Sequence, residues 1–151
     1  MISRSHLTPS ISCVMPAFNE AKNLRVVVPK TLAALQQLSH RVELLVVDDG
    51  SQDDTTRVMQ GLRCDHAQLV YAKLSRNFGK ESALTAGIDM ARGDIVFLMD
   101  ADGQHPTSLL PLMLSKWKQG ADVVYALRKT RDDQTALQAG LIRLFYKLIN
   151  W

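Results

Sequence analysis

The sequence predicts an α/β fold in which a mainly parallel sheet is flanked by helices. Apolar, β-branched runs alternate along the chain with helix-like segments, which is the order that βαβ units produce. The polar and unusual residues gather in the loops that follow the strands, where ligands bind in open α/β sheets. With 151 residues and a hydrophobic content of 46%, the chain is long enough for one domain with one core.

Each expected element has a signal of its own. Short runs rich in valine, isoleucine and leucine predict strands over residues 11–15, 42–48, 68–74, 94–100 and 122–127. The segments between them predict helices over residues 20–38, 53–63, 79–91 and 107–119. Ser51 or Asp53 and Thr107 suit the N-cap positions of two helices, while Gly93 and Gly120 suit helix ends.

Composition excludes some classes of protein. The net charge of +3 is mild, and the basic residues are scattered until Arg128, so nothing indicates nucleic acid as a partner. Cys13 and Cys64 lack metal-ligand spacing and are interpreted as buried free thiols in a reducing compartment. Residues 1–10 form a polar segment without the apolar core of a signal peptide, and no stretch of ~18 apolar residues predicts a transmembrane helix.

Acidic residues end two of the apolar runs. Asp100 and Asp102 follow the fourth expected strand, while Asp48 and Asp49 end the second. Carboxylates one residue apart at the carboxyl end of a strand suit Mg²⁺ or Mn²⁺, which can then hold a diphosphate. Helix capping and simple turns remain alternative explanations for the two pairs. Two acidic strand ends in one α/β pattern nevertheless suggest a nucleotide-diphosphate site.

Two further loops carry polar residues. The stretch 16–20, Pro-Ala-Phe-Asn-Glu, ends the first expected strand, and a helix start capped by Asn19 is its plain alternative. The stretch 76–81 places Arg76 and Lys80 at a helix entry, where backbone N–H groups suit a phosphate or carboxylate. An ordinary helix entry with solvated charges explains this stretch equally well. Its spacing does not fit a Walker loop, and no G-x-G-x-x-G motif occurs in the chain.

Residues 135–151 predict an amphipathic helix. Its apolar positions are Leu137, Leu141, Leu144, Phe145 and Leu148. Arg143 and Lys147 lie among them, a combination that suits a helix on a membrane surface. Packing of the same apolar face on the domain core is the alternative.

Together and in this order, the loops resemble those of glycosyltransferase family 2. The resemblance is strongest to its polyprenyl-phosphate sugar transferases, the dolichol-phosphate mannosyltransferase-like group. The matching stretches are 16–20, 47–51, 76–81, 99–106 and 123–128, so the resemblance covers nearly the whole chain from Ile11 onwards. The acidic motifs are common to the family, whereas the R-N-F-G-K stretch points more specifically to lipid-phosphate acceptors.

The resemblance implies a GT-A fold over residues 11–134 and an inverting sugar transfer from a UDP- or GDP-linked donor to a polyprenyl phosphate. The residues implied in donor binding are Pro16, Phe18, Glu20, Val47, Asp49, Asp100, Ala101, Asp102 and Arg128. Mg²⁺ or Mn²⁺ would be held by Asp100, Asp102 and Gln104, and Arg76 and Lys80 are candidates for the acceptor phosphate. A lipid phosphate is already anionic, so catalysis would rest on alignment and on neutralising the leaving group.

The chain departs from the family mainly in its length. Family members continue past this point, so the chain resembles the donor half of such an enzyme, and we expect weak or absent transfer by this chain alone. Gly103 stands where a larger apolar residue is common. The expected location is the cytoplasm, peripheral to the cytoplasmic face of the membrane.

Two alternatives stay open. One is a non-catalytic nucleotide-binding or interaction protein derived from such an enzyme. The other is a metal-dependent phosphotransferase of the haloacid-dehalogenase type, whose nucleophilic aspartate would follow the first strand, where residues 16–19 here read Pro-Ala-Phe-Asn. The sequence leaves the base, the sugar, the acceptor and the oligomeric state undetermined.

Overall fold

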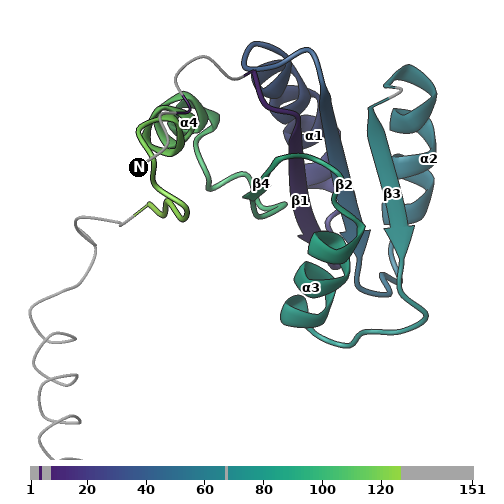
Figure 1. The fold of residues 1–151 in the computed structure, drawn as a ribbon. Helices are drawn as coiled ribbons and strands as arrows, with labels where there is room; N and C mark the ends of the chain where they lie inside the picture. Colours follow the sequence, from purple (N-terminus) through teal and green to yellow (C-terminus); the bar gives the residue numbers. More distant parts are fainter. Residues whose placement is uncertain (1–3, 5–7, 67, 127–151) are drawn as a thin grey trace, which may run out of the picture.

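A computed structural model provides the structure of the chain and describes residues 4, 8–66 and 68–126 (Figure 1). The strands are β1 (Ile11–Ala17), β2 (Val42–Asp48), β3 (Leu69–Lys73) and β4 (Ile95–Leu98). The helices are α1 (Ala21–Gln36), α2 (Thr55–Asp65), α3 (Lys80–Met90) and α4 (Leu110–Lys118), with a 3₁₀ turn over Thr107–Leu109 before α4. The predicted α/β fold with a parallel sheet is confirmed.

The four described strands form one parallel sheet in the order β3-β2-β1-β4. In the register of the sheet, Ile11 of β1 lies opposite Val42 of β2 on one side and Ile95 of β4 on the other. The chain first builds outward from β1 through β2 to β3, and then returns to place β4 on the other side of β1. The loops after β1 and β4 therefore start from the carboxyl ends of two neighbouring strands, the edge of the sheet at which open α/β folds bind ligands.

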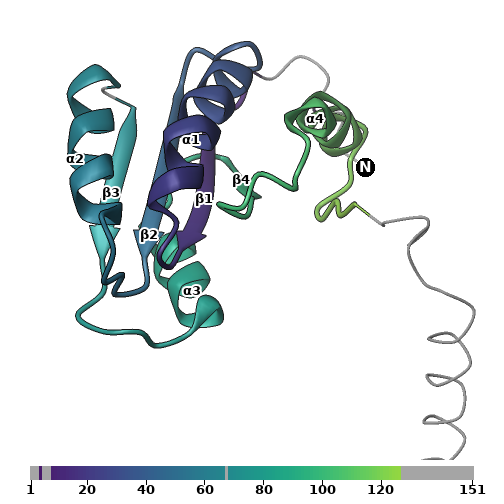
Figure 2. The same ribbon diagram turned by 180° about the vertical axis from the view of Figure 1, so that it is seen from behind.

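Helices cover both faces of the sheet. Helices α1 and α2 lie side by side on one face, and α3 packs on the opposite face against β1 and β2 (Figures 1 and 2). All seven residues of β1 are buried, as expected for a strand covered on both faces. Helix α1 buries Leu24, Val28, Leu32 and Leu35 at spacings of three and four residues, so its apolar stripe faces the sheet.

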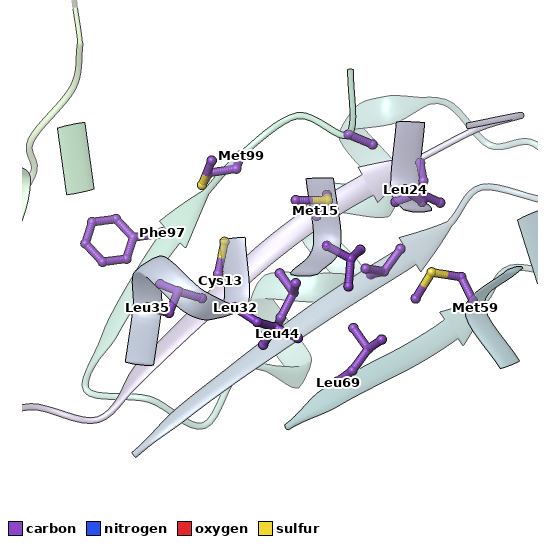
Figure 3. Packing of buried hydrophobic residues seen from close by; sticks show 14 of the residues in the cluster. Cys13, Met15, Leu24, Leu32, Leu35, Leu44, Met59, Leu69, Phe97 and Met99 are labelled. Carbon is purple, nitrogen blue, oxygen red and sulfur yellow. The ribbon is translucent and has the colours of Figure 1, made fainter. Parts of the chain in front are cut away.

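The main core lies between the sheet and the α1–α2 layer (Figure 3). Cys13 and Met15 of β1 and Leu44 of β2 meet Leu32 and Leu35 of α1 there. Burial raises the pKa of the Cys13 thiol to about 12, so this thiol stays protonated, in agreement with the expected buried cysteine. The same expectation is wrong for Cys64, which is exposed near the end of α2.

The expected strand over residues 122–127 is wrong for its described part. Residues 122–126 have no ladder partner among the described residues, and Val123 and Tyr125 are 79% and 73% exposed. A mostly apolar pocket of about 470 Å³ separates this segment from β4 and α4. A β-branched run forms a strand only when a neighbouring strand lies within hydrogen-bonding distance. Here the pocket lies between residues 122–126 and β4.

Other boundaries shift by a few residues. Strand β1 runs to Ala17, two residues beyond the expected end, and Thr107 opens the 3₁₀ turn instead of capping it. Residues 127–134 and the predicted helix over 135–151 lie outside the described residues. In the part of the chain that the structure describes, no helix combines the length and the apolar character needed to cross a bilayer.

Helix α3 approaches the sheet through a glycine. A Cβ atom placed on Gly87 would overlap the side chain of Val14 and lie 3.1 Å from Cγ2 of Val47. Val14 and Val47 are fully buried and β-branched, so neither can turn aside. The absence of a side chain at Gly87 therefore sets the close packing of α3 on β1 and β2.

Replacing Gly87 by alanine should destabilise the fold although alanine is the better helix former. Overpacking a tight contact costs about 1–3 kcal/mol, against a gain in helix propensity of up to about 1 kcal/mol. Gly61→Ala in α2 is the matched control, because nothing lies within 4 Å of its added Cβ atom. Urea unfolding followed by circular dichroism should show a lower free energy of unfolding for Gly87→Ala and a higher one for Gly61→Ala. Equal effects of the two substitutions would contradict the close packing at Gly87.

Candidate functional site

A pocket of about 300 Å³ lies at the carboxyl ends of β1, β2 and β4. Its lining residues are Pro16, Ala17, Phe18, Glu20, Asp49, Asn77, Gly79, Lys80, Asp100, Ala101 and Asp102. They come from four loops that the sequence analysis singled out separately, and the switch in strand order between β1 and β4 brings these loops together. The pocket is the candidate site because the chemistry-bearing residues of the chain converge there.

Asn19 ties the loop after β1 to the loop after β2. It adopts a left-handed backbone conformation with φ of 57°, which asparagine tolerates better than most residues. Its backbone N–H donates to Oγ of Ser51 at 2.8 Å, and its side-chain Oδ1 accepts from the N–H of Gln52 at 2.9 Å. The N-cap position of α1 belongs to Glu20, so Asn19 joins the two loops, and the alternative of Asn19 as a helix cap is wrong.

Asp49 ties the end of β2 to the start of α3. Its side chain is almost completely buried, and its two oxygens accept from the N–H groups of Phe78 at 2.7 Å and Gly79 at 2.9 Å. The next residue, Gly50, has φ of +73°, and a Cβ atom there would lie 2.5 Å from the carbonyl carbon of Arg76. Only glycine allows this contact, so the turn after β2 rests directly on the loop before α3.

Asp48 serves the interior of the same turn. It is fully buried, and its oxygens accept from the N–H of Ser51 at 2.7 Å and from the hydroxyl of Tyr71 at 2.5 Å. The Nζ atom of Lys73 lies 3.8 Å away. Burial, together with the hydrogen bond to Asp48, raises the pKa of Tyr71 to about 12. Asp48 is thus satisfied within the fold and does not line the pocket.

The loop after β4 presents a carboxylate that already carries a cationic partner. The Nζ atom of Lys80 lies 2.6 Å from Oδ1 of Asp100, across the pocket from the start of α3. His105 contacts the same residue, because its Nδ1 accepts from the Asp100 backbone N–H at 3.0 Å. Asp102 is exposed, and its Oδ1 accepts from the N–H of Gln104 at 2.9 Å.

The donor set at this loop fits an open divalent-cation site. Within residues 4, 8–66 and 68–126, no group of three or more histidine, cysteine, aspartate or glutamate side chains forms a metal site. Asp100 and Asp102 supply two carboxylates, and Mg²⁺ is typically held by one or two carboxylates together with substrate phosphates and water. Asp100 already accepts one positive charge in this structure, the ammonium of Lys80. The residues present therefore fit a cation that is shared with a diphosphate.

Three predicted site residues do not line the pocket, and a fourth cannot be placed relative to it. Val47 is fully buried beneath α3, and Arg76 is exposed with its guanidinium 4.9 Å from the centre of the Phe78 ring. Gln104 is exposed, and its backbone N–H holds Asp102. Arg128 lies outside the described residues.

The pocket also contains residues that sequence reasoning did not select. Ala17, Asn77 and Gly79 line it. Each falls inside a stretch that was already noted, 16–20 or 76–81, so the loops were identified while the individual positions were not. Sequence alone does not mark these three positions, because whether such a residue lines a pocket depends on which of its atoms face the cavity in the folded chain.

Comparison with known proteins identifies the family. Residues 12–150 match the model of a family described as Glycosyl transferase family 2. The chain belongs to this family. The match extends over nearly the whole chain and agrees with the resemblance carried by the four loops.

Individual relatives support the same assignment. The chain is 40% identical to a bactoprenol glucosyl transferase of Shigella phage SfV, over 93% of this chain and 46% of the relative. It is 40% identical to an undecaprenyl-phosphate 4-deoxy-4-formamido-L-arabinose transferase of Pseudomonas syringae, over 82% of this chain and 37% of the relative. The chain thus spans less than half the length of these curated relatives.

Solved structures share the fold. A mannosyltransferase of Pyrobaculum calidifontis, solved in complex with GDP-Man and Mn²⁺, superposes with a TM-score of 0.66 at 24% identity. The superposition covers 85% of this chain and 38% of that one. The predicted GT-A class of fold is thereby confirmed for the described sheet and helices.

Ionisation of Tyr71 should lower the stability of the fold at high pH. Its pKa is about 12 in the folded protein against 10.0 ordinarily, so the unfolded chain loses this proton first as the pH rises. The protonated Tyr71 hydroxyl stabilises the fold fully below about pH 10, and this contribution is lost between about pH 10 and 12. Urea unfolding across this range should show a smaller loss of stability for Tyr71→Phe than for the wild type. A tyrosinate absorbance assigned to Tyr71 with an unshifted midpoint in the folded protein would refute the predicted dependence.

Removing the charge of Asp49 should loosen the start of α3. The side-chain amide of Asp49→Asn would keep one acceptor, but its NH₂ group would face a backbone N–H, leaving a buried donor unsatisfied at a cost of about 1–3 kcal/mol. Asp54→Asn is the control, since Asp54 is exposed and makes no side-chain capping bond. We expect the free energy of unfolding to fall for Asp49→Asn and to change by less than about 0.5 kcal/mol for Asp54→Asn. A stability of Asp49→Asn equal to that of the control would disprove the clamp.

Proposed function

We propose that the chain binds a UDP- or GDP-linked sugar in the pocket at the ends of β1 and β4, as the donor-binding part of a glycosyltransferase. The observation that carries this proposal is the convergence of Glu20, Asp49, Asp100 and Asp102 in one pocket of a family 2 chain. In such a pocket, Glu20 and Asp49 offer hydrogen-bond acceptors for the base and ribose, and Asp100 and Asp102 offer oxygen ligands for a cation.

The two sides of the pocket have different chemistry. Phe18 is 42% exposed at the rim, where its ring offers a face against which a base can stack. Glu20 is held from behind by Asn23, whose Nδ2 donates to Oε2 at 2.6 Å, and a second oxygen remains to accept from a sugar hydroxyl. Asp100 and Asp102 lie on the opposite side, after β4. The proposed donor therefore lies with its base towards β1 and its diphosphate towards the loop after β4.

A divalent cation, Mg²⁺ or Mn²⁺, is proposed to join the diphosphate to Asp100 and Asp102. Without a cation, the acidic pocket would repel a diphosphate, because the described part of its lining carries four carboxylates and one ammonium, that of Lys80. When bound, the cation neutralises the leaving nucleoside diphosphate. The chain's own part is to hold the two carboxylates at the end of β4 and to orient Asp100 through His105. Gln104 and Arg128 remain proposed contributors to cation and diphosphate binding.

The proposed acceptor is a polyprenyl phosphate. The two relatives named above act on bactoprenol and on undecaprenyl phosphate, by their names. Lys80, at the start of α3, lines the pocket, and Arg76 lies in the loop before it. A phosphate monoester is anionic at neutral pH and can attack the sugar directly, so an inverting transfer needs no general base. We place the protein in the cytoplasm, at the membrane face where a lipid acceptor would be met, with residues 135–151 as the proposed membrane contact.

Calorimetric titration of the purified chain with UDP and with GDP, each with and without Mn²⁺, tests the donor site. We expect one nucleotide to bind and Mn²⁺ to strengthen its binding. Asp102→Asn should weaken the Mn²⁺-dependent binding by about tenfold or more, because a lost charged contact is worth about 1.5–3 kcal/mol. Asp89→Asn, on the exposed side of α3, should bind as the wild type does. If neither nucleotide binds with Mn²⁺ present, the proposed function is wrong.

A further inference from the structure

Lys80 is shared between two proposed tasks that exclude each other. It is a candidate for the acceptor phosphate, yet its ammonium lies 2.6 Å from Oδ1 of Asp100, a proposed cation ligand. One ammonium cannot pair with the Asp100 carboxylate and with the acceptor phosphate at the same time. The state of the Lys80–Asp100 pair therefore decides which task Lys80 performs.

Of the four carboxylates in the described pocket lining, Asp100 is the one that pairs with Lys80. Both oxygens of Asp49 accept from backbone N–H groups, and one oxygen of Glu20 accepts from Asn23. Among the residues that the structure describes, no backbone N–H donates to the Asp100 carboxylate, and the ring Nε2 of His105 lies 3.9 Å from its second oxygen. Among the described residues that line the pocket, Lys80 is the one cation. The pair thus offsets one of the negative charges in the pocket.

The position of Lys80 suits a group that changes partners. Lys80 is the first residue of α3, and the backbone just before it is held by Asp49. The side chain itself is 55% exposed and has a flexible four-carbon stem. Ion pairs with this much exposure contribute at most about 1 kcal/mol, so a divalent cation with a diphosphate can displace the ammonium. The backbone is fixed, and the charged end is free to move.

We propose that Lys80 is a placeholder cation that Asp100 exchanges for the donor's divalent ion. In the ligand-free pocket, Lys80 neutralises Asp100 and is withheld from an incoming phosphate. When the cation and the nucleotide diphosphate bind, Asp100 pairs with the cation, and the Lys80 ammonium turns to the phosphate monoester of the acceptor. The acceptor phosphate is thereby bound tightly only after the donor. This inference rests on the proposed function and specifies the order of binding at the same site.

Two variants of Lys80 and one control test the exchange at the level of cation binding. Mn²⁺ binding to the nucleotide-free chain is measured by electron paramagnetic resonance. Lys80→Gln should bind Mn²⁺ about three- to tenfold more tightly, because the competing charge is gone. Lys80→Arg keeps the competitor and should bind at or below the wild-type affinity. Lys30→Gln removes the same charge from an exposed position of α1 outside the pocket and should stay within about twofold of the wild type.

Phosphate binding tests the second half of the exchange. The affinity for farnesyl phosphate, and for inorganic phosphate as a probe without a lipid chain, is measured before and after saturation with Mn²⁺ and the nucleotide that binds. In the wild type, saturation should raise both affinities at least about threefold, because linkage makes the coupling reciprocal. In Lys80→Gln, saturation should leave them unchanged or lower.

The outcomes separate this inference from the proposed function. Unchanged Mn²⁺ affinity in Lys80→Gln, with nucleotide binding intact, overturns the exchange and leaves the donor site standing. An equal gain in Lys30→Gln also overturns it, because the effect would then be one of net charge. Absence of Mn²⁺ and nucleotide binding in both the wild type and Lys80→Gln overturns the donor site and the exchange together.

Discussion

The carboxylate of Asp49 is the constraint on which the site depends. A buried charge is costly unless it is fully hydrogen-bonded, and Asp49 meets this demand with the N–H groups of Phe78 and Gly79. These amides lie at the start of α3, where the helix dipole also favours a negative charge. The interaction therefore couples the end of β2 to α3 and sets the place from which Lys80 reaches the pocket. Gly50 strengthens the same coupling, since only a residue without Cβ allows the turn to touch Arg76.

The two adjacent aspartates at the end of β2 have different hydrogen-bond partners and different roles. Successive side chains along a strand point to opposite faces, so Asp48 and Asp49 enter different surroundings. Asp48 turns towards Tyr71 and Lys73 and stabilises the turn from within the fold. Asp49 turns to the pocket side and holds the loop before α3. Asp48 thus stabilises the turn after β2, whereas Asp49 joins that turn to the start of α3.

The electrostatics of the pocket are the physical basis of the proposed cation. Its described lining holds four carboxylates and one ammonium, and the ammonium is paired with Asp100, after β4. A diphosphate adds negative charge to this arrangement, and the proposed divalent cation would offset that charge. The apolar sheet behind the pocket keeps the loops in place, since β1, at its centre, is buried along its whole length.

The sequence by itself determined the parallel α/β architecture, the four loops of the site and the family. These features follow from local patterns: apolar runs of strand length, the amphipathic stripe of α1, and polar residues after each strand. Tertiary structure alone decided that Val47 packs beneath Gly87, that Asp49 clamps the loop before α3, and that Lys80 pairs with Asp100. It also left residues 122–126 without a strand partner, because an apolar pocket separates them from β4. Local patterns report what a residue can do, whereas a contact between distant residues exists only once the sheet order has placed them side by side.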